Sequence, residues 1–277
     1  MKGENRGSGD SPTVVVPIKQ VPDMDEVEFD RERGRIDRST AEAEPNPFDL
    51  NALEEAVLFK EELGGEVITI SMGPPQAESA LRDSLARGAD RAILLSDKAF
   101  GGADTWATAL TLSIAIRKLE SYDLIICGEK TVDGDTGQVG PEIAELLGIP
   151  HAAYVSGVTE RDDGSIKVNS DVWGKTFTRK LDFPGLITVT KDVNMPRIPL
   201  FRDKKRAREA EIETWGLEDL DVDEEKVGFN GSPTSVKEIE IAPEVNREGK
   251  VFKGEVRQAT ARLLRELSQD RVVEGAE

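Results

Sequence analysis

The sequence predicts an α/β fold in which a parallel sheet carries helices on both faces, followed by an antiparallel hairpin region and an extended C-terminal arm. Four strand-then-helix patterns alternate over residues 13–150. The strand patterns are short continuous apolar runs, which are typical of strands buried on both faces. After Pro150 the β-rich runs are separated by DDG and WG, as expected of antiparallel hairpins.

The elements follow in chain order. Residues 1–12 contain Gly, Ser and charged residues with nothing to bury, so we expect a disordered tail. The run TVVVPI predicts the first strand, and after a charged loop a helical stripe within residues 46–65 ends near Gly64. Three further strand–helix pairs are expected. In each pair the strand comes first: strand 66–73 with helix 74–90, strand 91–97 with helix 103–120, and strand 122–128 with helix 137–150. Asp104 or Thr105 is expected to cap the third helix.

The second half of the sequence predicts a smaller hydrophobic core than the first half. Residues 152–193 are expected to form hairpins, and two prolines and a basic cluster follow within 194–213. Residues 216–252 are polar and loop-rich, and residues 254–270 have the spacing of an amphipathic helix. We therefore expect one α/β domain over residues 13–190 and an arm over residues 191–277 that packs on another chain.

The composition limits the function classes. The 36 Lys and Arg against 54 Asp and Glu give a net charge of −18, which argues against nucleic-acid and anionic-membrane partners. No apolar run approaches the roughly 18 residues of a membrane span, and no secretory leader is visible, so we expect a cytoplasmic protein. The acidity fits either a hydrated surface in a salt-rich cytosol or an acidic docking face, and composition does not separate the two.

The carboxyl ends of the predicted strands give candidate site positions, because ligands bind at this edge of a parallel sheet. These ends are Pro17, Met72, Ser96–Asp97 and Gly128.

The richest of these positions begins the segment CGEKTVDGDTGQVGPEIAELLG at 127–148. Its glycines, Gly128, Gly134, Gly137 and Gly140, allow a close approach of backbone to ligand. Amides from Asp135 to Val139 at a helix N-terminus predict an anion site, with Thr136 and Gln138 as neutral donors. Asp133 and Asp135 would repel a phosphate, so they must point away, cap local amides or accept from ribose hydroxyls. The alternative is a purely structural glycine-rich turn.

Two familiar nucleotide motifs are missing from this segment. No Gly-Lys-Ser/Thr follows, and there is no G-x-G-x-x-G, so NTP hydrolysis and an ordinary NAD fold are disfavoured.

No set of catalytic side chains emerges. The single His151 is expected to be structural or at the surface, and the single Cys127 to belong to the core or a pocket wall. One Cys and one His exclude an intrachain disulfide, a Cys cluster and a multi-His metal site. Redox chemistry would therefore need a bound cofactor.

Several runs together resemble the β subunit of electron transfer flavoproteins. They are VPIKQVPD at 16–23, NPFDLNALEEAV at 46–57, GADRAILLSD at 88–97, CGEKTVDGDTGQVGP at 127–141, NMPRIPL at 194–200 and WGLEDLDVDEEKVGFNGSPT at 215–234. The resemblance implies a heterodimer whose α subunit binds the electron-carrying FAD. It also implies a β subunit of adenine-nucleotide-binding type that holds AMP or a second FAD. The arm at 191–277 would then pack on the α subunit.

The form DGDTGQVGP is more similar to the bifurcating branch, whose β subunit binds FAD. The resemblance implies a phosphate and ribose region lined by Gly128, Asp133, Gly134, Asp135, Thr136, Gln138 and Val139. It implies that Pro17, Asn46, Asp49 and Met72 line the rest of the pocket. Plain packing is the alternative for Pro17 and Met72, and capping of the following helix for Asn46.

The resemblance also implies a loop, around Ile198 to Arg206, that docks on partner dehydrogenases. Leu200 and above all Phe201 are the expected anchors, and inward packing is the alternative. The run LFRDKKRARE lacks the family's usual Ile-Met before the basic residues. The implied partners are the α subunit, acyl-CoA or other dehydrogenases, and a quinone reductase. The alternatives are an AMP-binding structural β subunit without its own redox flavin, and a stand-alone nucleotide-binding regulatory module.

Overall fold

The structure is a computed structural model that describes residues 11–23, 28–30, 35–37, 43–237, 249–270 and 272. The chain forms two compact units, residues 1–238 and 239–277. Most of the tail expected at residues 1–12 lies outside the described residues.

A nine-stranded sheet organises the described part of the first unit, in the order β11-β10-β9-β12-β8-β1-β6-β7-β13. The parallel strands are β1 (Thr13–Pro17), β6 (Glu66–Met72), β7 (Arg91–Leu95), β8 (Leu124–Gly128), β12 (Gly185–Val189) and β13 (Glu213–Trp215). The hairpin strands, which pair with one another in antiparallel fashion, are β9 (His151–Arg161), β10 (Ser165–Val172) and β11 (Lys175–Asp182). The predicted α/β fold is confirmed.

The hairpin strands are not a separate layer. Strand β9 pairs in parallel with β12 and antiparallel with β10, so the hairpins extend the same sheet. The short edge strand β13, which pairs with β7, was not predicted. Three residues carry too little periodicity to be recognised, and the pairing partner is more than 100 residues away.

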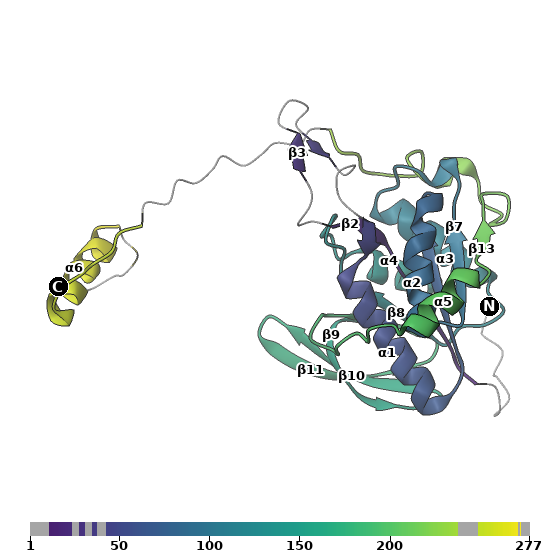
Figure 1. Ribbon diagram of the computed structural model, residues 1–277, viewed down its shortest axis with the longest axis horizontal. Coiled ribbons are helices and arrows are strands. Elements are labelled where there is room, and N and C mark those ends of the chain that lie inside the picture. The colour runs from purple at the N-terminus through teal and green to yellow at the C-terminus, as the bar shows by residue number, and fades with distance from the viewer. Residues whose placement is uncertain are drawn as a thin grey trace. The chain divides into compact units, whose positions relative to one another are not determined.

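Helices cover both faces of the sheet (Figure 1). On one face α1 (Pro47–Leu63) and α2 (Glu78–Arg87) pack through Leu53 and Leu81 in one apolar cluster with Val14 and Val16. On the other face α3 (Thr105–Lys118) and α4 (Val139–Leu147) pack in a second cluster with Val15. Alternate residues of β1 thus enter opposite clusters, as the continuous apolar run predicts.

Two predicted helix ends are also found. The Asp104 carboxylate accepts a hydrogen bond from the Ala107 amide at 3.0 Å and so caps α3, whereas Thr105 is the first helical residue. Gly64 follows α1 with φ +80°, a conformation that favours glycine.

Some segments expected to be loops contain short elements. Strand β2 (Gln20–Pro22) pairs with β5 (Ala43–Pro45), and β3 (Glu28–Asp30) pairs with β4 (Arg35–Asp37). Short helices are η1 (Pro75–Ala77), η2 (Lys98–Phe100) and η3 (Glu224–Lys226). The basic segment after Leu200 forms α5 (Phe201–Glu209), so the expected docking loop is wrong in conformation over most of its length.

The second unit contains the predicted C-terminal helix, α6 (Val256–Gln269). Its apolar residues Val256, Leu263 and Leu264 are exposed. Among the described residues, no helix is both long and apolar enough to cross a membrane.

Candidate functional site

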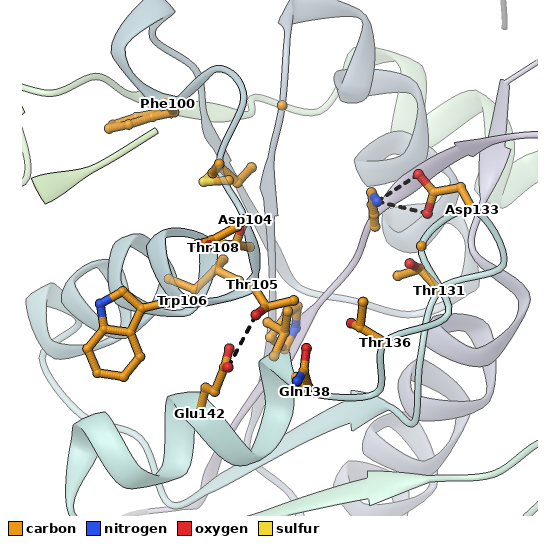
Figure 2. A pocket seen from close by; sticks show the side chains of 18 of the residues that line it. Phe100, Asp104, Thr105, Trp106, Thr108, Thr131, Asp133, Thr136, Gln138 and Glu142 are labelled. Atoms are coloured by element: carbon orange, nitrogen blue, oxygen red, sulfur yellow. Dashed lines mark hydrogen bonds and ion pairs between the residues drawn. The ribbon is translucent and has the colours of Figure 1, made fainter. Parts of the chain in front are cut away.

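A cavity of about 1650 Å³ opens at the carboxyl edge of the parallel strands (Figure 2). Pro17, Met72, Asp97 and Gly128 line it from the ends of β1, β6, β7 and β8. The strand-end rule therefore identified the position of the cavity from sequence.

The loop between β8 and α4 forms one wall of this cavity. Gly128, Asp133, Gly134, Thr136, Gln138 and Val139 all line it. The loop turns back through left-handed backbone at Asp135 and Gly137, with φ of +53° and +64°. Figure 2 shows Thr131, Thr136 and Gln138 along this loop, leading to the start of α4. Neutral donors and a helix N-terminus thus lie on the same wall, as an anion site requires.

Two glycines of this segment are required for packing against protein atoms. A Cβ on Gly128 would lie 2.4 Å from Asp49 Oδ1, at the start of α1. A Cβ on Gly140 would lie 2.5 Å from Thr188 Cγ2 on β12. The expectation that these glycines serve ligand approach is therefore incomplete, because the first closes the loop onto α1 and the second seats α4 on the sheet.

The two loop aspartates have different surroundings. Both Asp133 carboxylate oxygens lie 2.8 Å from Lys19 Nζ, and this pair lies on the cavity wall. The Asp135 carboxylate pairs with Lys130 at 2.7 Å, is 68% exposed and is not among the cavity-lining residues. The Asp135 side chain thus points away from the cavity, which is one of the positions expected for it, and its part in nucleotide binding stays a prediction. Lys19 offsets the charge of Asp133.

Asn46 is a correction to the predicted lining, because it lies behind the wall and is fully buried. Its Nδ2 donates to the Lys130 carbonyl at 2.9 Å, and its Oδ1 accepts from the Val132 amide at 3.2 Å. Asn46 occupies the N-cap position of α1, as the capping alternative predicts, but its side chain makes no capping hydrogen bond. Asn46 instead fixes the cavity loop to the start of α1.

Asp49 lines the cavity and is buried at the same helix end. Its Oδ2 accepts a hydrogen bond from the Lys19 amide at 2.8 Å. Burial raises the pKa of its carboxyl from 3.8 to about 7, against the opposing effect of hydrogen bonds from the Lys19 backbone, Asn46 and the Gly128 backbone. The start of α1 therefore holds both Lys19 and residues 128–132.

A second wall, formed by the start of α3, was missed at the level of sequence. Thr105, Trp106 and Thr108 line it, and Thr105 Oγ1 donates to Glu142 Oε1 on α4 at 3.2 Å (Figure 2). Burial raises the pKa of the Glu142 carboxyl. The strand-end rule pointed to Asp97, but α3 begins eight residues later, after a loop whose path the sequence pattern does not give.

The two single residues behave as expected. Cys127 lines the cavity, and burial raises the pKa of its thiol, so it stays protonated at neutral pH. His151 is exposed at the first position of β9. Within the described residues, no group of three or more His, Cys, Asp or Glu is placed to hold a metal ion.

Both expected docking anchors are exposed at the start of α5. Phe201 is 82% exposed, and Leu200 is exposed as well, so the alternative of inward packing is wrong. A small hollow lies between Phe201, Lys204, Lys205 and Arg208.

The fold and the cavity define a class: a parallel α/β domain with a cavity at the carboxyl edge of its sheet. The family model "Electron transfer flavoprotein domain" matches residues 34–220. The chain belongs to the electron transfer flavoprotein family, whose function is electron transfer.

Curated relatives agree over most of the chain. The "Electron transfer flavoprotein subunit beta" of Clostridium acetobutylicum is 42% identical over 261 residues, covering 94% of this chain and 99% of that protein. "Caffeyl-CoA reductase-Etf complex subunit CarD" of Acetobacterium woodii is 43% identical over 224 residues, covering 80% and 85%. "Protein FixA" of Azorhizobium caulinodans is 40% identical over 242 residues, covering 85% and 86%.

Proposed function

We propose that this chain is the β subunit of a heterodimeric electron transfer flavoprotein and that its cavity holds FAD. The observation that carries the proposal is the cavity at the strand ends. Its volume of about 1650 Å³ and its walls, which run from the 128–139 loop to the start of α3, give room for an extended dinucleotide.

The residues on the cavity walls fit such a ligand. The start of α4, with Thr136 and Gln138, offers neutral donors to phosphate oxygens, and Lys19 offsets Asp133 beside them. The wall formed by Thr105, Trp106 and Thr108 offers hydroxyl and aromatic surface to the part of the ligand without phosphates. A bound flavin supplies hydride acceptance and one-electron transfer, and bifurcation would send the two electrons along separate paths. This chain's side chains bind and shield the cofactor, and none acts as acid or base.

AMP is the alternative occupant of the same walls. It would use the donors of the 128–139 loop and leave the wall at α3 without ligand contacts. The subunit would then be structural, with the redox FAD held together with the α subunit.

Two surfaces support the proposed partners. The exposed apolar side chains of α6, at Val256, Leu263 and Leu264, fit an arm that packs on the α subunit. The exposed Leu200 and Phe201 directly precede the basic residues of α5 in the sequence. These basic residues are a local exception in a chain with a net charge of −18. An apolar anchor beside cations suits a dehydrogenase or quinone reductase with an acidic rim around an apolar pocket.

The test is a count of cofactors. The chain is co-expressed with an electron transfer flavoprotein α subunit of the same organism, and the FAD and AMP released per heterodimer are quantified by absorbance and chromatography. We expect two FAD per heterodimer. One FAD with one AMP would establish the structural alternative. Failure to form a complex, with no nucleotide bound, would refute the proposal and favour the stand-alone regulatory module.

A further inference from the structure

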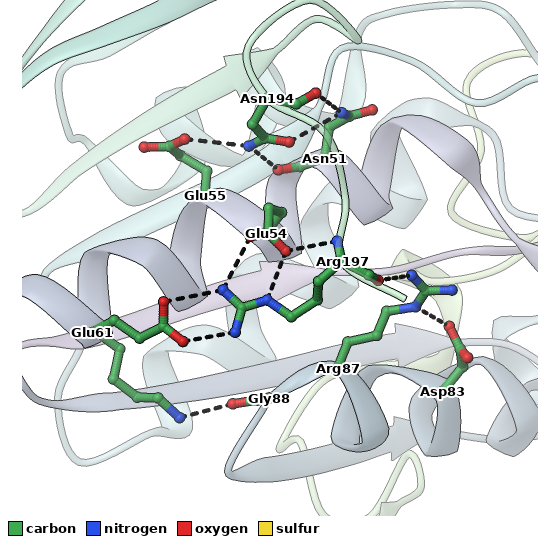
Figure 3. A network of polar contacts seen from close by, with 10 residues as sticks. Asn51, Glu54, Glu55, Glu61, Asp83, Arg87, Gly88, Asn194 and Arg197 are labelled. Carbon is green, nitrogen blue, oxygen red and sulfur yellow. Dashed lines mark hydrogen bonds and ion pairs between the residues drawn. The ribbon is translucent and has the colours of Figure 1, made fainter. Parts of the chain in front are cut away.

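The segment that precedes α5 alternates between anchored and exposed residues. Met195 and Ile198 are 89% and 86% exposed, although both are apolar. Asn194 and Arg197 instead turn toward α1, where they contact side chains of that helix (Figure 3). The exposed apolar side chains contribute no core packing to this unit, so their positions depend on the anchored residues between them.

Arg197 makes the largest set of these contacts. Its guanidinium binds Glu54 through Nε–Oε2 at 2.8 Å and Nη2–Oε1 at 3.0 Å. It binds Glu61 through Nη1–Oε1 at 2.7 Å and Nη2–Oε2 at 3.1 Å. The planar fork thus engages two carboxylates two turns apart on α1, a geometry that a lysine cannot reproduce.

The backbone of the segment is held as well. The Arg197 amide donates to Glu54 Oε2 at 3.0 Å, and its carbonyl accepts from Arg87 Nη1 on α2 at 2.6 Å. Asn51 Nδ2 on α1 donates to the Asn194 carbonyl at 3.0 Å. Two helices therefore fix the main chain at both ends of residues 194–197.

Burial strengthens the inner part of this arrangement. The Glu54 side chain is only 9% exposed, and its carboxylate receives both the guanidinium and the amide of Arg197. Charge-assisted hydrogen bonds at a buried carboxylate are strong, and losing one partner leaves a buried charge behind. Pro196 and Pro199 further restrict the backbone on either side of Arg197.

We propose that Arg197 is a positioning residue for docking: it fixes residues 195–201 in the conformation that a partner protein binds. This rests on the proposed function, in which the same segment docks on a dehydrogenase. A partner that meets an already ordered apolar segment does not have to immobilise it, so association is more favourable.

The test compares Arg197→Lys with the matched control Arg91→Lys. Arg91 on β7 also binds two carboxylates, Glu66 and Glu213, and among the described residues no hydrogen bond or ion pair joins either of them to residues 194–201. Two readouts are taken on the purified heterodimer. The first is amide hydrogen exchange of residues 194–201, and the second is steady-state reduction by an acyl-CoA dehydrogenase of the same organism.

We expect Arg197→Lys to speed exchange of residues 194–201 by roughly tenfold or more, because charge-assisted hydrogen bonds hold them. The KM for the dehydrogenase should rise by a similar factor while kcat stays unchanged. Arg91→Lys should change neither. If Arg197→Lys does not fold, Glu61→Gln removes the outer, more exposed half of the contact and should give a smaller change of the same kind.

Unchanged exchange in Arg197→Lys would overturn the inference, and so would faster exchange with an unchanged KM. Equal effects of the two arginine variants on KM would also overturn it, because the effect would then be general destabilisation. Failure of the wild-type heterodimer to accept electrons from any dehydrogenase would instead count against the proposed function. The exchange of residues 194–201 would still decide whether Arg197 orders the segment.

Discussion

The buried carboxyl of Asp49 makes the stability of this subunit depend on pH. Its pKa is raised to about 7 in the folded chain from an ordinary 3.8, mainly by burial. Over the window between these values the folded state keeps its proton while the unfolded state loses it. The free energy of unfolding therefore falls as the pH rises toward 7 and is constant above it.

The size of this effect follows from the shift. A difference of about 3 pKa units at 1.36 kcal/mol per unit gives roughly 4 kcal/mol lost between pH 4 and pH 7. Asp49→Asn cannot ionise, so its stability should not fall across that window for this reason. At the acidic end the variant should be the less stable protein. In the wild type, the Lys19 backbone N–H donates to Asp49 Oδ2 at 2.8 Å. The Asn side chain keeps one acceptor oxygen, but it places its own N–H group toward the Lys19 backbone N–H, so that hydrogen bond is lost.

The assay is urea unfolding of the heterodimer, followed by circular dichroism, between about pH 5 and pH 8. Glu145→Gln, at an exposed position of α4, is the control for the loss of one carboxylate. We expect the stability difference between wild type and Asp49→Asn to shrink or change sign as the pH rises, and the control to run parallel to wild type. Parallel profiles for wild type and Asp49→Asn would show that the pKa of Asp49 does not differ between the folded and unfolded states.

Three further predictions concern single side chains. Gly128→Ala should lower the free energy of unfolding by about 1–3 kcal/mol and reduce the bound FAD, because the new Cβ would collide with Asp49. Thermal melts and flavin content measure the two effects, and the control Gly164→Ala, which has open space around its Cβ, should change neither. Asn46→Ala should lower the free energy of unfolding by about 1–3 kcal/mol and weaken nucleotide binding, because two backbone groups of the cavity loop lose their hydrogen-bond partner. Titration calorimetry of FAD into the apo-heterodimer measures the affinity, and an unchanged affinity would contradict the prediction. Phe201→Ala should leave the melting temperature unchanged but raise the KM for a partner dehydrogenase roughly tenfold; an unchanged KM would remove Phe201 from the docking surface.

The sequence was most informative where the pattern is local. The apolar run at β1 predicted a strand buried on both faces, and its alternate residues do enter two different clusters. The strand-end rule identified the cavity because parallel strands align their carboxyl ends whatever the loops do. The cap at Asp104 and the helix end at Gly64 follow from backbone chemistry within one turn.

The remaining features depend on contacts that are distant in sequence. Asn46 was expected in the lining, yet its amide faces the main chain of residues 130–132, which no local pattern reveals. Asp135 turns outward to Lys130 because the loop passes through left-handed backbone at that residue. The wall at Thr105 and Glu142 requires α3 and α4 to start side by side, and that follows only from the packing of the whole sheet.

The most direct test of the central claim is an experimental structure of the purified heterodimer with its natural cofactors. We expect FAD in the cavity at the carboxyl edge, with phosphates at the 136–139 segment and the rest of the ligand against Pro17, Met72 and the wall at Thr105. A heterodimer whose flavin lies wholly on the partner chain, with this cavity filled only by solvent, would contradict it.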